Sequence, residues 1–385
     1  MLHVILFEDS SVSSFYPIAL TRPVGELRMG ILTIREKWEK ALGHPVHHET
    51  RAHLRELFPP FSGKGPAYRI NARLIPTASV VAQIQSLGEG EKLMDRDVLL
   101  AERTGASEVV HQVHAAPFLL HHITDVFSRN GDAIRLDFEA VTRGRTSHSP
   151  GEGVMVLGPA ENLFAEEGAK LRGCLINVEE GPVYIGRHAE IMEGCMIRGP
   201  LALCEYTVIK MGAKLYGPTT FGPECRIGGE VSNSVIQGYS NKGHDGFLGN
   251  SVLGEWCNLG ADTNTSNLKN NYSAVRVWNY ETSGMEDSGL TFVGLIMGDH
   301  GKSGINTMFN TGTVAGVAAN VFGGGFPPKY IPSFSWGGPE GMTTYRLEDA
   351  LITADRMMSR RHVALTDAMK QMLTEVARMA QTKGI

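Results

Sequence analysis

Residues 183–227 read VYIGRHAEIMEGCMIRGPLALCEYTVIKMGAKLYGPTTFGPECRI and contain a repeat with a period of six residues. Every sixth residue from Ile185 onward is large and apolar: Ile185, Ile191, Ile197, Leu203, Ile209, Leu215, Phe221 and Ile227. The residue two positions earlier is mostly small or β-branched: Val183, Ala189, Cys195, Leu201, Thr207, Ala213, Thr219 and Cys225. A helix does not explain the pattern, because six residues rotate it by about 600°. The repeat therefore predicts short strands whose alternate side chains face inward, each followed by a corner.

Three such sides close one coil of roughly 18 residues, and stacked coils form a parallel β-helix. Glycine, asparagine and aspartate gather at corners, where a positive φ costs them little. The step continues through Phe247, Leu253 and Leu259, breaks between Asn264 and Leu290, and resumes at Met297, Phe309 and Val321, with the small Ser303 and Ala315 between. We therefore expect residues 264–290 to form a loop outside the helix, of the kind that builds binding surfaces in solenoids.

The two ends of the chain have different patterns. Val4–Phe7 and Asn71–Pro76 are typical of strands, and Ile31–Leu42 and Ala78–Leu87 are typical of helices, which indicates an α/β domain. Asp137–Pro150 is expected to cross over to the repeats. Two methionine-rich helical stripes follow Gly341, and we expect them to pack against the solenoid or a sister subunit. The predicted divisions are 1–150, 151–335 and a helical segment 336–385.

Composition limits the function classes. Lys and Arg number 36 against 41 Asp and Glu, so the charge of −5 gives no general attraction for nucleic acid or anionic membranes. No apolar run reaches the roughly 18 residues of a membrane helix, and MLHVILFEDS lacks the basic start of a signal peptide. The five cysteines contain no CxxC pair, which argues against a disulfide framework or a zinc site. We expect a cytoplasmic protein.

Residues 241–267, NKGHDGFLGNSVLGEWCNLGADTNTSN, carry a motif within the repeat. Gly243-His244, Leu248-Gly249, Asn258-Leu259-Gly260-Ala261 and Asn267 resemble the hexapeptide-repeat transferase family, in particular the bifunctional N-acetylglucosamine-1-phosphate uridylyltransferase and glucosamine-1-phosphate N-acetyltransferase. Residues 298–316, GDHGKSGINTMFNTGTVAG, resemble the next coils of that family, and the start, VILFEDSSVSSFYPIALTRP, resembles a sugar nucleotidyltransferase. The resemblance covers essentially residues 1–335.

The resemblance implies a left-handed parallel β-helix, a homotrimer, and an acetyl-CoA site between subunits. It places His244 as the general base and Asn258 and Asn267 as contacts to an amino-sugar phosphate. It places Ala261, Ile305 and Gly323 against acetyl-CoA. Two positions depart from the family: Phe247 replaces an expected tyrosine, and Ser232 stands near the place of a phosphate-binding lysine.

The chemistry of His244 fits this role, because an amine must lose a proton as it attacks a thioester and imidazole titrates in the right range. The alternative is a structural corner residue that bonds to a neighbouring coil. A zinc site, as in the carbonic anhydrases of this fold, is disfavoured because His188, His244 and His300 are the only histidines in the repeats and are widely spaced.

The amino-terminal part departs further from its family. An intact nucleotidyltransferase begins with a glycine-rich loop whose N–H groups wrap phosphates, but residues 6–10 read LFEDS. Glu8 and Asp9 would repel a triphosphate unless a metal lay between them. Arg22 and Arg28 are candidate phosphate contacts, and Mg²⁺ is expected only if this domain is active.

We therefore expect an acyl-CoA-dependent N-acyltransferase that acts on an amino-sugar phosphate or nucleotide sugar. The alternatives are a bifunctional nucleotidyltransferase and acetyltransferase, and a scaffold without catalysis that binds a sugar nucleotide.

Overall fold

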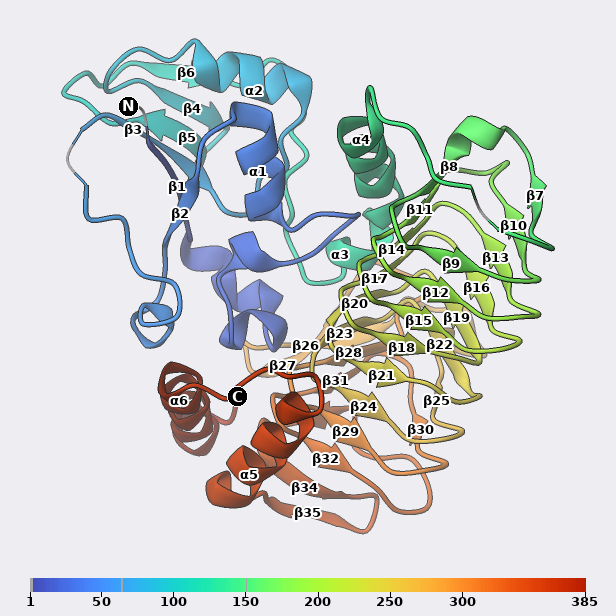
Figure 1. Cartoon of the computed structure of the whole chain (residues 1–385). Helices are drawn as coiled ribbons and strands as arrows, with labels where there is room; N and C mark the ends of the chain where they lie inside the picture. Colours follow the sequence, from blue (N-terminus) through green and yellow to red (C-terminus); the bar gives the residue numbers. More distant parts are fainter. Residues whose placement is uncertain (1–2, 64, 150) are drawn as a thin grey trace.

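The six-residue repeat forms a three-sided parallel solenoid in the computed structural model, which describes residues 3–63, 65–149 and 151–385 (Figure 1). We number its faces in chain order. Face 1 contains β7 (Met155–Leu157), β10 (Leu175–Asn177), β13 (Met196–Arg198), β16 (Lys214–Tyr216), β19 (Glu230–Ser232) and β22 (Phe247–Gly249). The two-stranded sheet of β25 (Asn264–Thr265) and β30 (Met308–Phe309) follows β22 along the solenoid.

Faces 2 and 3 are longer. Face 2 contains β8 (Leu163–Ala165), β11 (Val183–Ile185), β14 (Leu201–Leu203), β17 (Thr219–Phe221), β20 (Val235–Gly238), β23 (Val252–Glu255), β28 (Leu295–Met297), β31 (Thr313–Ala315) and β33 (Tyr330–Ile331). Face 3 contains β9 (Lys170–Leu171), β12 (Glu190–Ile191), β15 (Val208–Ile209), β18 (Arg226–Ile227), β21 (Asn241–Lys242), β24 (Asn258–Leu259), β29 (Lys302–Ser303), β32 (Asn320–Val321), β34 (Ser335–Gly338) and the antiparallel β35 (Gly341–Thr344).

The predicted inward residues form the solenoid core. All eight large residues from Ile185 to Ile227 and all eight residues two places before them are at most 2% exposed. One later prediction is wrong: Leu248, not Phe247, faces inward, and Phe247 is half-buried on the outer side of face 1. The coils after Ile227 are shorter, with inward residues at Val231, Ile236 and Leu248. A shift of one residue exchanges the two sides of a strand.

The amino-terminal domain is built on a mixed sheet of order β2-β1-β3-β5-β4-β6. Its strands are β1 (His3–Phe7), β2 (Val46–Glu49), β3 (Ala67–Asn71), β4 (Lys92–Asp95), β5 (Val98–Arg103) and β6 (Val110–Gln112). Helices α1 (Ile34–Leu42) and α2 (Ala78–Gln85) confirm the expected helices, while α3 (Asp125–Ser128) and α4 (Asn130–Thr142) lead to the solenoid. The predicted crossover 137–150 thus begins inside α4, and its last residue, Pro150, lies outside the described residues.

The amino-terminal domain lies on the outer side of face 2. The outward residues Val235, Val252, Ile296 and Val314 belong to the same apolar cluster as the core of the amino-terminal sheet. Polar contacts cross the same boundary: Asn130 Nδ2 donates to Thr220 Oγ1 (3.1 Å). Face 2 is therefore covered by the protein itself (Figure 1).

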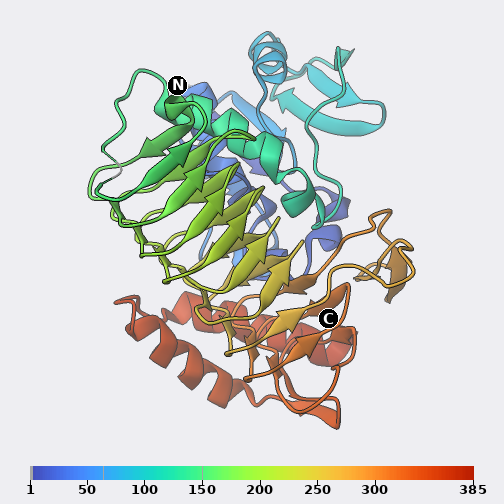
Figure 2. The ribbon, with the colours of Figure 1, turned by 90° about the vertical axis from the view of Figure 1, so that its right-hand side faces the viewer.

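The carboxy-terminal helices α5 (Leu347–Ser359) and α6 (Asp367–Lys383) cover the edge between faces 2 and 3, at the late end of the solenoid (Figure 2). Met358, Leu373 and Val376 share an apolar cluster with Trp256 and Phe334 of that edge. The two methionine-rich helices therefore pack against the solenoid, which is one of the two arrangements expected from the sequence.

The break in the repeat is a projecting hairpin of β26 (Arg276–Asn279) and β27 (Gly284–Asp287). The predicted loop 264–290 begins slightly too early, because Asn264 and Thr265 still form β25. The hairpin projects from the coils and packs against the amino-terminal domain, as the contact of Tyr280 with Tyr16 shows (Figure 2).

A matched pair of variants tests the inward packing. Ile197 is 2% exposed and its neighbour Met196 is 61% exposed on the same strand. We expect Ile197→Ala to lower the free energy of unfolding by roughly 2–5 kcal/mol, because it leaves a cavity in the core. Met196→Ala should change it by no more than about 0.5 kcal/mol. Urea titration measures both, and equal effects would contradict the inward register.

Candidate functional site

The edge between faces 3 and 1 brings several predicted site residues into one line. The corner at Asp245 lies directly over the next corner, since Asp262 N donates to Asp245 O (3.0 Å). Asn306 N then donates to Ala261 O (2.8 Å), which stacks the corner of Ile305 on that of Ala261. Gly323 lies in the segment after β32, the next turn along this edge. His244, Ala261, Ile305 and Gly323 therefore follow one edge, which we call the 3–1 edge.

His244 is an exposed residue of this edge. It lies between β21 and β22, and within the described part of the chain its imidazole has no hydrogen-bond partner. Its backbone oxygen is bound by Lys242 Nζ. The side chain is thus free to meet a ligand from outside the solenoid.

Lys242 is a functional candidate that the sequence reasoning missed. It occupies an inward position of β21, parallel to the inward Ile227, and is 2% exposed. Burial lowers the pKa of its amine to about 8, although the carboxylates of Asp245 and Asp262 act in the opposite direction. The predicted register placed Phe247 inward and therefore Lys242 outward. Because this register is wrong by one residue, the sequence pattern did not predict that Lys242 is buried.

The two asparagines lie away from the line of the 3–1 edge. Asn258 is on the outer side of face 3, where its Oδ1 accepts from Asn241 Nδ2 (3.4 Å) and Asn241 in turn accepts from Arg361 (3.1 Å). Asn267 follows β25 at the opposite end of face 1, and its amide donates to Asn250 Oδ1 (2.8 Å). Within one chain, face 1 separates Asn267 from His244.

The positions that depart from the family lie on face 1. Phe247 begins β22, close to the corner of His244, and Ser232 pairs with Gly249 at the other end of the neighbouring strand. A side chain on Gly249 would collide with the Phe247 ring and the Asn267 amide. Glycine at this point lets those two groups approach each other across the strand.

The carboxyl end of β1 is a second candidate surface. Open α/β sheets bind ligands at the carboxyl ends of strands, where the connections from two adjacent strands run to opposite sides. Strand β1 is parallel to β2 on one side and β3 on the other, so the divergence lies here. Glu8 and Asp9 follow β1, and both are occupied. Glu8 accepts from Val24 N (2.9 Å) and Arg51 Nε (3.1 Å).

Asp9 is bound by Arg73, by Asn71 Nδ2 (2.9 Å) and by Ser11 N (3.0 Å). Burial alone would raise the pKa of Asp9, but these donors lower it below its usual value. The acids that replace the glycine-rich loop are thus held as internal ion pairs. No group of three or more His, Cys, Asp or Glu side chains that could hold a metal occurs in the described ranges.

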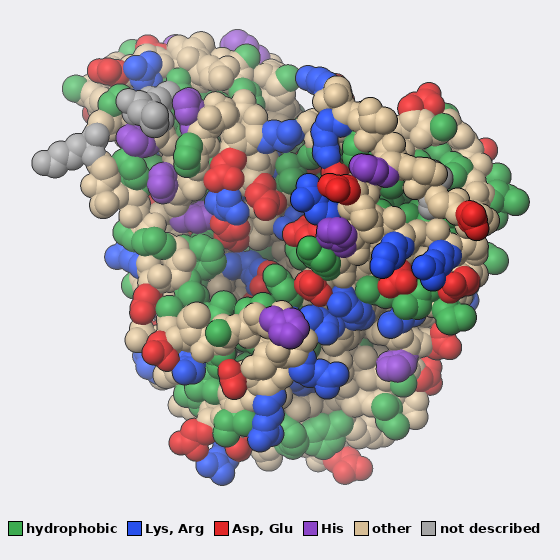
Figure 3. Space-filling model, in the orientation of Figure 1, with side chains coloured by type: hydrophobic (Ala, Val, Ile, Leu, Met, Phe, Trp, Pro, Cys, Tyr) green, Lys and Arg blue, Asp and Glu red, His purple; other side chains and the backbone are tan. Residues whose placement is uncertain are grey.

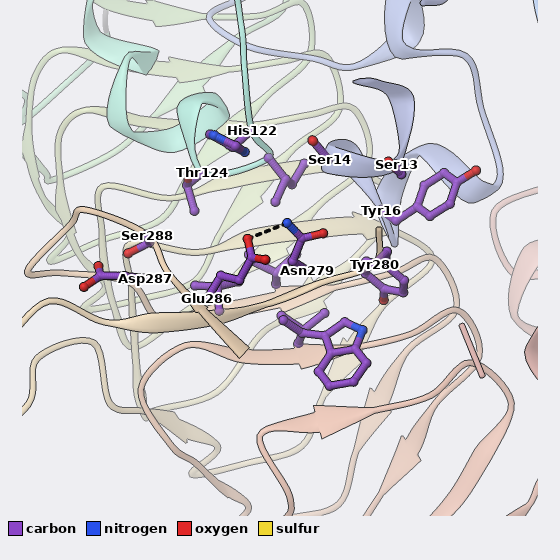
Figure 4. A pocket seen from close by; sticks show the side chains of 15 residues that line it. Ser13, Ser14, Tyr16, His122, Thr124, Asn279, Tyr280, Glu286, Asp287 and Ser288 are labelled. Carbon is purple, nitrogen blue, oxygen red and sulfur yellow. Dashed lines mark hydrogen bonds between the residues drawn. The ribbon is translucent and has the colours of Figure 1, made fainter. Parts of the chain in front are cut away.

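The same end of the sheet is closed by the hairpin. A cavity of about 90 Å³ remains between residues 13–16, residues 122–124 and the hairpin (Figure 4). Asn279 and Glu286 lie side by side on the hairpin wall of this cavity, where Asn279 Nδ2 donates to Glu286 Oε2 (2.6 Å). Pockets for drug-sized ligands usually measure about 300–1,000 Å³, so a nucleotide does not fit here unless the hairpin moves.

Arg22 and Arg28 lie between the domains, where Arg22 is buried and Arg28 is partly buried. Arg22 pairs with Glu255 (2.9 Å) and with Asp299. Arg28 lies near Glu36 (3.6 Å), and its backbone N–H donates to Gln237 Oε1 (2.7 Å). Both guanidinium groups therefore already have protein partners. Asp299 belongs to the segment GDHG, residues 298–301. The sequence pattern there predicted further coils, but it did not predict that Asp299 forms an ion pair.

Comparison with known proteins agrees with these two parts. Residues 4–146 match the sequence family described as "Sugar nucleotidyl transferase". The bifunctional protein GlmU of Methanocaldococcus jannaschii is 36% identical over 87 residues, 23% of this chain and 21% of that protein. A bifunctional sugar-1-phosphate nucleotidylyltransferase/acetyltransferase of Sulfurisphaera tokodaii is 31% identical over 156 residues, 38% of each chain. The matches thus span well under half the length of these relatives.

Among solved structures, the UDP-N-acetylglucosamine acyltransferase of Francisella novicida has 12% identity and a TM-score of 0.30, over 60% of this chain and 90% of that one. The polySia-specific acetyltransferase NeuO has 11% identity and a TM-score of 0.29, over 55% of this chain and 94% of that one. The resemblance expected from the sequence is confirmed: residues 4–146 match a sugar nucleotidyl transferase family, a three-sided parallel β-helix follows them, and bifunctional proteins are distant relatives. No helix within residues 3–63, 65–149 and 151–385 is long and apolar enough to cross a membrane.

Lys242 gives a pH prediction. Its pKa is about 8 in the folded chain against an ordinary value of 10.5. Between these values unfolding takes up a proton, so stability rises as the pH increases through this window. Urea titrations should show a larger rise in the free energy of unfolding from pH 8 to 10 for the wild type than for Lys242→Met.

Lys242→Met should also be the more stable protein at pH 7, since it removes a buried charge. Lys170→Met, at an exposed position of face 3, should keep the wild-type slope. Equal slopes for wild type and Lys242→Met would contradict the inward position of the amine.

Proposed function

We propose that the chain is an acyl-CoA-dependent N-acyltransferase whose acceptor is an amino-sugar phosphate or a nucleotide sugar, and that acyl transfer occurs at the 3–1 edge. The observation that carries the proposal is the free imidazole of His244, exposed on the edge that also holds Ala261, Ile305 and Gly323. The comparisons support a transferase with both types of domain.

In this proposal His244 removes the proton from the acceptor amine as the amine attacks the thioester carbonyl. The developing oxyanion needs a donor, and backbone N–H groups at the stacked corners are of the kind that can supply one. Collapse of the tetrahedral intermediate expels the CoA thiolate, which takes up a proton. No covalent enzyme intermediate is needed.

Exposed apolar residues support the position of the acyl-CoA. Ile305 is 71% exposed and Phe326 56% exposed, and Met308 and Phe322 are also exposed near the same edge. A patch of exposed apolar side chains on a protein surface commonly marks a binding site. The thioester arm of CoA is sufficiently apolar to lie along it.

A homotrimer is part of this proposal. Face 2 and the late part of the 2–3 edge are covered within the chain, whereas face 1, face 3 and the 3–1 edge remain accessible to a partner. Met155, Met196 and Tyr216 are exposed on face 1. A partner there could place its Asn258 or Asn267 beside His244, which the single chain does not do.

Multi-angle light scattering tests the assembly. We expect a mass close to three times the 41.9 kDa of the chain at micromolar concentration. A monomer would contradict a site shared between subunits.

The His244→Ala variant tests the role of the base. General-base catalysis typically contributes about 10²–10⁴-fold, so we expect kcat to fall by that factor while acetyl-CoA affinity stays nearly unchanged. Asn267→Ala should instead weaken acceptor binding, because its contact exists in both ground and transition states. Free thiol release from acetyl-CoA, measured over a panel of amino-sugar phosphates and nucleotide amino sugars, gives the rates.

His188→Ala is the matched control, since His188 is an exposed solenoid corner on a different edge. It should retain wild-type kcat. If His244→Ala keeps more than about half of the wild-type kcat, the hundredfold expectation for base catalysis fails and His244 is a structural corner residue.

We further propose that the amino-terminal domain does not carry out pyrophosphorylase chemistry. The ion pairs of Glu8 and Asp9 and the hairpin over the small cavity support this. UTP or dTTP with a sugar 1-phosphate and Mg²⁺ should release no pyrophosphate above a blank. Release that Asp9→Ala abolishes would favour the bifunctional alternative. Absence of both activities would favour the non-catalytic scaffold.

A further inference from the structure

A larger cavity lies where the amino-terminal domain, the 2–3 edge and the carboxy-terminal helices meet. Its volume is about 440 Å³, within the usual range for small-molecule pockets. Charged side chains of both signs gather in the hollow between these three parts (Figure 3). The cavity lies on a different edge of the solenoid from His244.

One wall is a column of aromatic side chains. Tyr239, Trp256 and His300 occupy equivalent corners in three successive coils, each with φ between 51° and 61°. The rings of Tyr239 and Trp256 stack at 4.3 Å, and those of Trp256 and His300 lie nearly parallel at 6.4 Å. A positive φ recurs at this corner along the whole 2–3 edge, as at His188, Tyr206 and Glu224, so it belongs to the geometry of the coil and not to the cavity.

The polar side-chain atoms of this column are unpartnered within the described residues. Within the described ranges no hydrogen bond is made by Tyr239 Oη, Trp256 Nε1 or His300 Nδ1, and all three residues line the cavity. His300 is only 7% exposed, and its Nδ1 is fully buried. Buried polar atoms are normally satisfied, so the buried Nδ1 of His300 is an exception. Tyr239 Oη and Trp256 Nε1 are not buried in this way, so a ligand in the cavity can reach them.

The charges in the cavity exclude a strongly anionic ligand. Its charged side chains comprise three guanidinium groups and four carboxylates: Arg22, Arg28, Arg35, Glu26, Glu36, Glu255 and Asp299. Burial lowers the pKa of His300 to about 3, with help from Lys302 and Arg22, so its imidazole is neutral at physiological pH. The guanidinium groups are already paired with carboxylates. The lining thus carries a net charge of −1 (three positive, four negative).

Two carboxylates remain accessible. The side chains of Glu36 and Glu255 are 34% and 30% exposed, whereas Arg22 and Asp299 are 8% and 7% exposed. A ligand ammonium group could therefore approach Glu36 and Glu255 without breaking the buried pair.

We propose that this cavity binds an amine-bearing sugar that carries no phosphate, with its hydroxyl groups bonded to Tyr239 Oη and Trp256 Nε1 and its ammonium group beside Glu36 and Glu255. A sugar ring offers several donors and acceptors over a short span, which suits two unpartnered polar groups on one wall. The methionines of the third wall, Met358, Met369 and Met372, can adapt to its shape. The proposal does not depend on acyl transfer at the 3–1 edge.

Calorimetric titration of the full chain with glucosamine, glucose and glucose 1-phosphate tests it. Glucosamine should bind about tenfold more tightly than glucose, because its ammonium makes charge-assisted bonds. Glucose 1-phosphate should bind more weakly than glucose. Glu36→Gln should remove most of the preference for glucosamine while the glutamine retains the helix cap that Glu36 makes with Thr33.

Trp256→Phe keeps the ring and removes the N–H, and it should weaken binding of both glucosamine and glucose. Trp336→Phe is the matched control, since Trp336 lies on face 3 outside this cavity, and it should bind like the wild type. Absence of detectable glucosamine binding at about 10 mM would overturn the proposal. Tighter binding of glucose 1-phosphate, or unchanged binding in both Glu36→Gln and Trp256→Phe, would do the same.

Discussion

The structure depends on one constraint: each six-residue side of the solenoid turns one row of side chains inward and leaves another row outside. The inward row builds a continuous apolar core from Leu163 to Ile331. The outer rows must then meet water, another part of the chain or another molecule. What covers each outer row determines where a ligand can bind.

The chain covers these rows unequally. The outer row of face 2 is apolar and merges with the core of the amino-terminal sheet through Val235, Val252 and Ile296. The late part of the 2–3 edge is covered by α5 and α6. Face 1 and the 3–1 edge remain open, and the motif around His244 lies there. The hairpin of β26 and β27 lies beside residues 13–16 and leaves only a cavity of about 90 Å³ there.

Much of this could be predicted from the sequence, because local spacing dictates it. The inward rows from Val183 to Ile227 follow directly from a six-residue step. The slip at Phe247 arose where the coils shorten, since a strand of two or three residues holds too little pattern to correct a shift. The same error of one residue is the reason that the burial of Lys242 was not predicted.

Other features depend on contacts between distant segments. Arg22 meets Asp299 across 277 residues of sequence, and nothing near Arg22 predicts that partner. The cavity beside Trp256 is formed by three segments that are far apart in the sequence: the amino-terminal domain, the 2–3 edge and the carboxy-terminal helices. From the sequence, Glu8 is expected to repel a triphosphate, but in the structure its carboxylate forms an ion pair with Arg51. Such features follow from tertiary packing, which spacing along the chain does not encode.

The central claim is that acyl-CoA binds along the 3–1 edge, and hydrogen–deuterium exchange with and without acetyl-CoA tests it most directly. We expect slower exchange of backbone amides at residues 304–307 and 322–326, with little change at residues 238–240, which lie at the 2–3 edge. Protection confined to the amino-terminal domain or to the cavity beside Trp256 would contradict it, as would exchange that acetyl-CoA leaves unchanged throughout the chain.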